Sequence, residues 1–132
     1  MIHTLEIKTT QQTELIDITG AVQNLVNRYG PTDGACMVYV PHTTAGITIN
    51  ENADPTVRQD ILMILNQVIP ADAPYRHAEG NSPAHIKATL TGTTATVPIE
   101  SGRLVLGTWQ GIFFCEFDGP RRRQVKVKFL SG

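Results

Sequence analysis

The sequence predicts an α+β fold: a single compact domain with a mixed, mostly antiparallel β-sheet and two to three helices. Its 132 residues fall within the usual length of one domain. Segments with strand periodicity are interspersed with helical patterns, and the regular βαβ rhythm of a parallel sheet is absent. No repeat, low-complexity segment or long linker divides the chain. We therefore expect one domain over residues 1–132.

The first half of the chain predicts four strands and one helix. Strand-like alternation or a short apolar run occurs in four segments: 5–10, 15–18, 35–40 and 47–50. Between the second and the third of these, apolar residues recur at helical spacing from Thr19, which could cap the helix, to Tyr29. Gly30 and Pro31 then stop this helix.

A second helix is expected to begin at Asp54 and Pro55. Aspartate accepts hydrogen bonds from the free N–H groups of a first turn, and proline has no N–H that needs a partner there. Pro70 ends the helix. Its apolar stripe follows helical spacing: Val57, Ile61, Ile64, Leu65 and Val68.

A polar loop over 71–81 leads to a short third helix from Ser82 to Leu90, with Gly92 beyond its end. Residues 100–103 have the composition of a hairpin turn. Strand patterns cover the rest of the chain in four segments: 94–99, 104–106, 112–117 and 125–130.

Composition excludes some classes of function. The chain has 11 Lys plus Arg against 12 Asp plus Glu, so it lacks the general basic field of a nucleic-acid-binding protein. No segment reaches the ~18 apolar residues of a membrane span. Cys36 and Cys115 lie in apolar runs and are expected to be buried free thiols. We expect a cytoplasmic protein with neither nucleic acid nor membrane as partner.

Three of the four histidines lie in dense polar clusters between apolar segments. His42 opens a loop of small residues, while His77 and His85 flank Glu79 and Asn81. Such groups are costly to desolvate unless they bind each other or a ligand. Three neutral imidazoles can hold zinc or a similar divalent metal and leave a position open for substrate. The alternative is a solvated polar loop, since this spacing is not that of a metalloprotease pair.

A second polar group comprises Asn50, Glu51, Asn52 and Asp54. These side chains could bind a polar ligand or Mg²⁺. Helix capping is sufficient to explain Asp54, which leaves the other three less explained. Glu51 could act as a general base if it is partly desolvated.

A third polar group surrounds the last strands. Trp109, the only tryptophan, could close a pocket over an aromatic ligand or pack in the core. Glu116 alternates with apolar neighbours and points to the face opposite theirs, either into a pocket or to solvent. Arg121, Arg122 and Arg123 could grip phosphate or protect a sheet edge by charge.

Together these segments resemble the YjbQ-like family, whose members are often labelled secondary thiamine-phosphate synthases. Three ordered blocks carry the resemblance: Pro-His-Thr-Thr-Ala-Gly from position 41 with Ile-Asn-Glu-Asn-Ala-Asp-Pro from 49, His-Ala-Glu-Gly-Asn from 77 with Ala-His-Ile-Lys from 84, and Leu-Gly-Thr-Trp-Gln from 106 with Glu-Phe-Asp-Gly-Pro-Arg from 116. They span essentially the whole chain.

The resemblance implies a YjbQ-like domain assembled as a homotrimer, with sites around the histidines near a subunit boundary. The activity it implies is weak coupling of hydroxymethylpyrimidine diphosphate to a thiazole phosphate, which gives thiamine phosphate and pyrophosphate. In this interpretation His42, His77 and His85 are metal ligands, and Glu51 or Glu116 is the catalytic carboxylate. Six residues are expected to contact the ligand: Asn50, Asn52, Asn81, Lys87, Trp109 and Arg121.

Two functions stay open at this point. Dedicated thiamine-phosphate synthases are much larger barrels, and this chain has no βα repeat. Diphosphate departure usually uses Mg²⁺, whereas a histidine cluster suits a softer metal such as zinc. The protein is either an enzyme acting on a small phosphorylated molecule or a non-catalytic trimer that binds a metal or phosphate ligand. A second reason to expect a trimer is that one small domain would not fully cover the apolar strands at 112–117 and 125–130.

Overall fold

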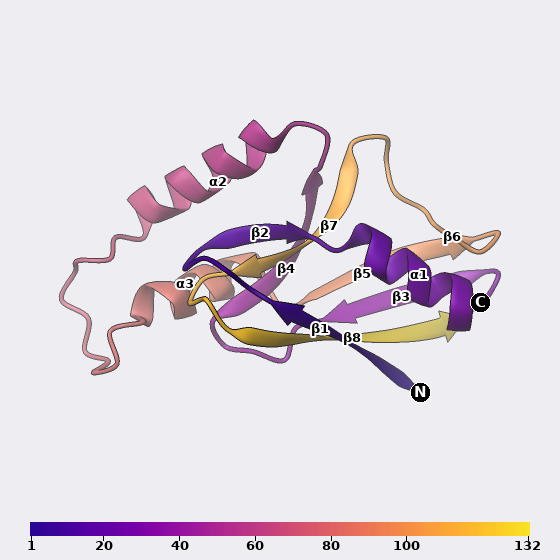
Figure 1. Cartoon of the computed structure of the whole chain (residues 1–132), viewed down its shortest axis with the longest axis horizontal. Coiled ribbons are helices and arrows are strands. Elements are labelled where there is room, and N and C mark those ends of the chain that lie inside the picture. The colour runs from indigo at the N-terminus through magenta and orange to yellow at the C-terminus, as the bar shows by residue number, and fades with distance from the viewer.

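Two antiparallel β-sheets form the centre of the computed structural model, which describes residues 1–132 (Figure 1). The larger sheet has the order β1-β8-β3-β5-β6 and the smaller sheet the order β2-β7-β4. The larger sheet contains β1 (Ile2–Lys8), β8 (Arg122–Ser131), β3 (Gly34–Tyr39), β5 (Thr94–Glu100) and β6 (Arg103–Leu104). The smaller sheet contains β2 (Glu14–Asp17), β7 (Gln110–Glu116) and β4 (Ala45–Glu51). The helices are α1 (Thr19–Tyr29), α2 (Pro55–Val68) and α3 (Ser82–Thr91).

The predicted α+β class, the mostly antiparallel strands and the three helices are confirmed. In detail, every strand pairing is antiparallel, and the strands divide between two sheets. The first strand runs from Ile2 to Lys8 rather than over 5–10, because β8 pairs with it along that whole length. Thr19 begins α1 instead of capping it, since the carboxylate of Asp17 accepts hydrogen bonds from its N–H and its hydroxyl.

The predicted cap and hairpin turn are confirmed. The carboxylate of Asp54 accepts hydrogen bonds from the hydroxyl and the N–H of Thr56, at 2.7 and 2.9 Å, and these bonds lower the pKa of Asp54. Ser101 and Gly102 connect β5 to β6 with φ angles of 52° and 75°. Two left-handed residues give the backbone twist that a two-residue hairpin requires.

Strand β7 lies between two hydrophobic clusters and is buried on both faces. On one face, Ile112 and Phe114 join a core between the two sheets, which α1 completes through Val22. On the other face, Phe113 packs in a smaller cluster with Ala84 of α3. Polar residues at the end of β7 therefore emerge from the most buried part of the molecule.

Helix α2 packs less tightly than its sequence pattern predicts. None of its residues is buried, although Ile61 and Leu65 contact the smaller cluster. Ile64 and Val68, two members of the predicted stripe, are 48% and 68% exposed. In Figure 1 the helix lies outside the sheets, connected through β4 and the loop that leads to α3. One chain therefore leaves an apolar face of α2 uncovered.

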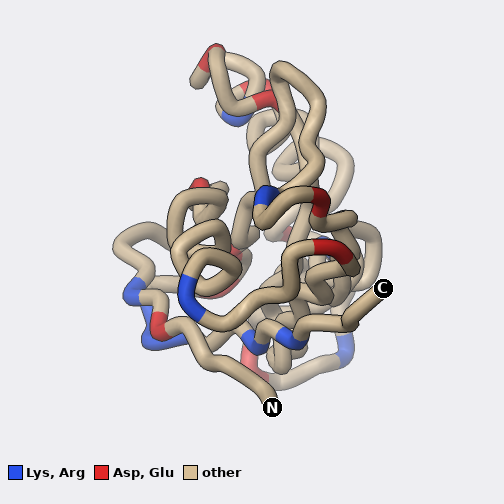
Figure 2. Tube along the Cα trace, turned by 90° about the vertical axis from the view of Figure 1, so that its right-hand side faces the viewer, with Lys and Arg blue, Asp and Glu red and all other residues tan.

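Basic and acidic residues are interspersed along the folded chain (Figure 2), and the net charge is −1. Cys36 and Cys115 are buried free thiols, as expected. None of the three helices combines the length and the apolar character that crossing a bilayer requires.

Candidate functional site

An open cleft of about 780 Å³ lies where β3 ends and α3 begins. It brings together five of the residues that the sequence nominates for a site: His42, His77, Asn81, His85 and Arg121. They come from three separate segments of the chain: the loop after β3, the region around the start of α3, and the turn before β8. The walls also include Thr44, Glu79, Asp118 and Arg123. We call this space the histidine cleft.

The rings of His77 and His85 form a close pair. Their centroids lie 5.6 Å apart with the planes at 89°. Such a pair can donate two hydrogen bonds to one oxyanion or supply two nitrogens to one metal ion. Within one chain, however, no three His, Cys, Asp or Glu side chains form a group that could hold a metal ion. A zinc ion on this pair would need further ligands from outside this arrangement.

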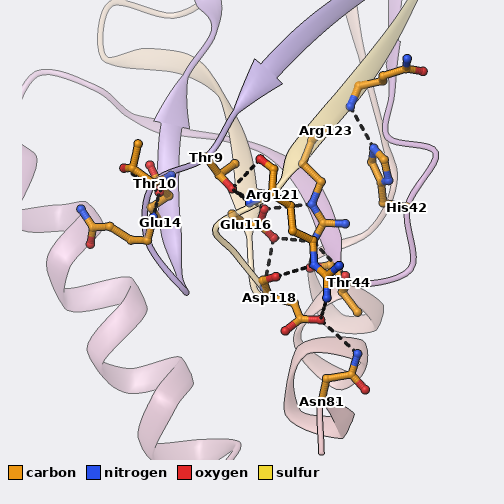
Figure 3. Close-up of polar contacts among 12 residues, drawn as sticks. Thr9, Thr10, Glu14, His42, Thr44, Asn81, Glu116, Asp118, Arg121 and Arg123 are labelled. Atoms are coloured by element: carbon orange, nitrogen blue, oxygen red, sulfur yellow. Dashed lines mark hydrogen bonds and ion pairs between the residues drawn. The ribbon is translucent and has the colours of Figure 1, made fainter. Parts of the chain in front are cut away.

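His42 is held by the backbone of β8. Its Nε2 accepts a hydrogen bond from the N–H of Gln124 at 2.9 Å (Figure 3). Burial and then the positive charge of Arg123 lower the pKa of His42. A neutral imidazole that accepts through Nε2 carries its proton on Nδ1. His42 can therefore offer a ligand an N–H donor, and its Nε2 lone pair is already occupied.

Arg121 is fixed at the cleft by Asp118. Its Nε donates to the Asp118 carbonyl oxygen at 2.7 Å and its Nη2 to the carboxylate Oδ2 at 3.0 Å. Asn81 Nδ2 donates to the same Oδ2 at 3.0 Å (Figure 3). The Arg121 side chain is still 53% exposed, so its remaining N–H groups are available to an anion.

Glu116 and Arg123 form a buried ion pair beneath the cleft (Figure 3). Arg123 Nε and Nη2 donate to the two carboxylate oxygens at 2.9 and 2.5 Å. Glu116 also accepts hydrogen bonds from the Thr9 hydroxyl at 2.8 Å and from the Asp118 N–H at 3.0 Å. Arg123 in turn donates to the Thr44 hydroxyl at 2.8 Å. The pair thus ties β7 of the smaller sheet to β8 of the larger one.

This environment keeps Glu116 ionised. Burial alone would raise its pKa, but hydrogen bonds from Arg123, the Asp118 N–H and Thr9, with the Arg123 charge, lower it overall. A general base needs a free lone pair and a pKa near the working pH. Glu116 is 0% exposed, and both of its oxygens accept hydrogen bonds. Its geometry therefore favours a positioning role, in which Glu116 holds Arg123 and the turn at Asp118 in place, instead of the catalytic role expected from the sequence.

The three consecutive arginines have three different environments. Arg121 lines the cleft, Arg122 is exposed and Arg123 is buried. Alternation along β8 explains the last of these, because Val125 faces the core and Arg123 shares its side of the strand. The sequence carried a signal that we missed: Glu116 and Arg123 both occupy inward positions of apolar strands, where each needs a partner.

Thr44 and Glu79 line the cleft, although neither is among the ligand contacts expected from the sequence. Glu79 is exposed and belongs to neither ion pair of the chain. Each residue follows a cleft histidine by two positions, His42 and His77 respectively, and lies in a bend or a turn of the chain. Membership of the polar clusters around these two histidines was the available signal.

Four nominated residues lie at the opposite end of the smaller sheet: Asn50, Glu51, Asn52 and Trp109. Strand β4 pairs with β7 from Ala45 opposite Glu116 to Glu51 opposite Gln110. Six residue steps of ~3.4 Å separate these ends by ~20 Å. One chain therefore does not bring these four residues to the histidine cleft. We call this region the Glu51 end.

Polar groups at the Glu51 end bond mostly to backbone, while Asn52 Nδ2 also donates to Asp17 Oδ2 at 3.5 Å. Glu51 accepts a hydrogen bond from the Ala53 N–H at 2.9 Å, and the Asn52 N–H donates to the Trp109 carbonyl at 3.0 Å. Asn50 accepts one from the N–H of Glu51. Trp109 is 63% exposed, so in one chain it neither packs in the core nor closes a pocket.

Lys87 lies outside the histidine cleft and lines a second, smaller cavity of about 250 Å³. Its Nζ donates to Asn66 Oδ1 at 2.5 Å, and burial lowers the pKa of Lys87. Asn81 and Asp118 line both the cavity and the cleft. The hydrogen bond between these two residues therefore lies on the partition.

Comparison with known proteins places this fold and cleft in a family. Residues 3–132 match the family of UPF0047 proteins described as YjbQ-like. The chain is 53% identical over 132 residues to UPF0047 protein YugU of Bacillus subtilis (strain 168), covering 99% of this chain and 100% of that protein. It is 52% identical over 131 residues to UPF0047 protein MJ1081 of Methanocaldococcus jannaschii, covering 99% and 95%. The crystal structure of an uncharacterised YjbQ/UPF0047 protein from Clostridium acetobutylicum matches with a TM-score of 0.95 at 54% identity, covering 97% of this chain and 99% of that one.

Proposed function

The chain belongs to the YjbQ-like UPF0047 family, and on that premise we propose that its histidine cleft binds the phosphate or diphosphate group of a small molecule. The observation that carries this proposal is the convergence of His42, His77, His85 and Arg121 on one open cleft. Each of these side chains can donate N–H groups to phosphate oxygens. The cleft volume also lies within the range of small-molecule sites.

We propose further that the reaction is the coupling implied by the family resemblance. The C–O bond between the pyrimidine methylene and its diphosphate breaks, and the thiazole nitrogen forms a C–N bond to that methylene. Pyrophosphate leaves with the bonding electrons. Arg121, His77 and His85 would stabilise the charge that develops on the leaving group. Because the thiazole nitrogen carries no proton, this reaction needs no carboxylate base, which agrees with the positioning role of Glu116.

A non-catalytic phosphate-binding protein is the second candidate. Diphosphate departure usually uses a divalent ion, and one chain gathers no three side chains that could hold a metal ion. A protein that binds a phosphorylated ligand without transforming it would need no such ion. Zinc, or magnesium in the case of diphosphate chemistry, therefore stays a proposal that elemental analysis of the purified protein decides.

We also propose a homotrimer, in which the number of subunits rests on the family resemblance. The expectation that residues 112–117 are left uncovered is wrong, because all of them are buried within their own chain. Uncovered apolar side chains lie instead on α2, α3 and the larger sheet: Ile2, Tyr39, Met63, Ile64, Val68, Leu90 and Leu130. A monomer mass in light scattering at micromolar concentration would contradict the trimer. The two free thiols agree with the reducing cytoplasm, which we propose as the location.

Calorimetric titration with inorganic pyrophosphate, with and without a chelator, tests the binding proposal. We expect binding in both conditions, and no binding at about 1 mM pyrophosphate would contradict the phosphate site. Pyrophosphate release from the two substrates then separates the candidates. Turnover that His77→Ala abolishes supports the enzyme, whereas binding without turnover supports the binding protein.

A further inference from the structure

Lys87 is a buried cation without a carboxylate partner. The residue is 6% exposed, and the two ion pairs of the chain involve other residues. Its single hydrogen bond goes to the neutral amide oxygen of Asn66. An ammonium group has three N–H donors, and a buried charge without a counter-charge is costly. Lys87 would therefore be stabilised by an anion that the chain itself does not supply.

The cavity beside Lys87 has room for such an anion. Its volume of about 250 Å³ is several times the ~30 Å³ that one water molecule occupies in the liquid. Polar side chains contribute much of its wall: Gln12, Thr13, Asn66, Asn81 and Asp118. The Asp118 carboxylate does not dominate this wall, because its charge is paired with Arg121 on the cleft side.

The first turn of α3 also favours an anion in this cavity. Pro83, Ala84 and Lys87 line the cavity, and Lys87 lies on the same side of the helix as the other two because it is four positions after Pro83 and three after Ala84. Asn81 makes no side-chain cap, and the first turn contains no acidic residue. The partial positive charge of the helix N-terminus is therefore not balanced by an acidic side chain of the helix itself.

The partition supplies an unused acceptor. Asn81 Nδ2 donates to Asp118 Oδ2 at 3.0 Å, whereas Asn81 Oδ1 is buried without a hydrogen-bond partner. A monohydrogen phosphate has acceptor oxygens for Lys87 and one O–H group for such an acceptor. Its chemistry therefore matches both unpaired groups of the wall.

We propose that this cavity is a second oxyanion subsite, in which Lys87 anchors a phosphate group on the far side of the Asn81–Asp118 partition from the histidine cleft. Two phosphate positions separated by one hydrogen-bonded pair suit a protein that brings two phosphorylated molecules together. The idea that two phosphorylated molecules bind together rests on the proposed function of the cleft, whereas the Lys87 subsite itself does not.

Titration of the whole protein with inorganic phosphate tests the subsite. The wild type is expected to show two binding events. Lys87→Met should weaken one of them at least tenfold, and His77→Ala should weaken the other. Lys128→Met, which changes an exposed lysine of β8, is the matched control and should change neither event.

Asn66→Asp keeps the test decisive if Lys87→Met fails to fold. A carboxylate at this position gives Lys87 an internal counter-charge, so the variant should unfold at or above the wild-type temperature and lose the Lys87-dependent event. Two events that persist at wild-type affinity in Asn66→Asp would overturn the subsite. So would a single event that only His77→Ala removes. A single event that only the Lys87 and Asn66 variants remove would overturn the cleft proposal and support the subsite.

Discussion

The two ends of the smaller sheet contain similar polar residues in very different environments. At the end of β7 next to the cleft, Glu116 is buried and bonded to residues of distant segments. At the Glu51 end, the carboxylate of Glu51 bonds to an N–H two residues away. In the sequence both ends are rich in polar side chains: Asn50, Glu51, Asn52 and Asp54 at one end, and Glu116, Asp118 and the arginines 121–123 at the other. Polar density therefore does not identify a site; the burial of the polar groups distinguishes the two ends.

The largest expected effect comes from the buried pair at the cleft end. Arg123→Met leaves the Glu116 carboxylate buried without its partner, and we expect a loss of about 3–5 kcal/mol in the free energy of unfolding. The double variant Arg123→Met with Glu116→Leu removes both charges and should recover most of that loss. Urea denaturation of the three proteins measures both effects. A single variant as stable as the wild type would contradict the structural role of the pair.

The same pair predicts how stability depends on pH. The pKa of Glu116 in the folded protein lies below its ordinary value of 4.5, so the unfolded chain takes up the proton first as the pH falls. The stabilising contribution is therefore complete above about pH 4.5 and is lost as the pH falls through the folded pKa. Thermal unfolding between pH 6 and pH 3 should show a steeper loss in the wild type than in the double variant. Parallel profiles would contradict this assignment.

A smaller effect is expected at the open side of the cleft. Arg121→Ala and His85→Ala each remove N–H donors for an anion, and a hydrogen bond to a charged group contributes about 1.5–3 kcal/mol. We therefore expect pyrophosphate affinity to fall at least tenfold in each variant. Circular dichroism should show an unchanged fold. Arg122→Ala, a change at the exposed neighbour, is the control and should bind pyrophosphate like the wild type.

The sequence predicts the elements of this fold well and its sites only in part. Local signals such as the Asp54 cap depend on neighbouring residues and can be read from the chain. His42 follows β3 and His77 precedes α3, and the two residues line one cleft only after the sheets and helices have packed together. The geometry of the cleft therefore depends on tertiary contacts. The buried pair of Glu116 and Arg123 was accessible through strand alternation. The Glu51 end was nominated because composition alone cannot show that the carboxylate of Glu51 bonds to a backbone N–H two residues away.

A modest effect is expected from the helix cap next to the Glu51 end. Asp54→Ala removes the acceptor for the N–H and hydroxyl of Thr56, which should lower the melting temperature by a few degrees. Asp54→Asn keeps a side-chain oxygen acceptor and should unfold near the wild-type temperature. Loss of pyrophosphate binding in a normally folded Asp54→Asn protein would mean that Asp54 belongs to a ligand site.

The smallest effect on ligand binding should come from the Glu51 end itself. Glu51→Gln keeps an oxygen that can accept from the Ala53 N–H, and Trp109→Ala truncates an exposed side chain. Both positions lie ~20 Å along β4 and β7 from the cleft, so neither change alters the groups that contact pyrophosphate there. We therefore expect pyrophosphate affinity within about twofold of the wild type in both variants. A tenfold loss in either one would have a specific meaning. Because no single chain brings these residues to its own cleft, the loss would show that a neighbouring subunit supplies them. Mixed oligomers of Glu51→Gln and His77→Ala chains should then regain part of the binding that each variant lacks alone.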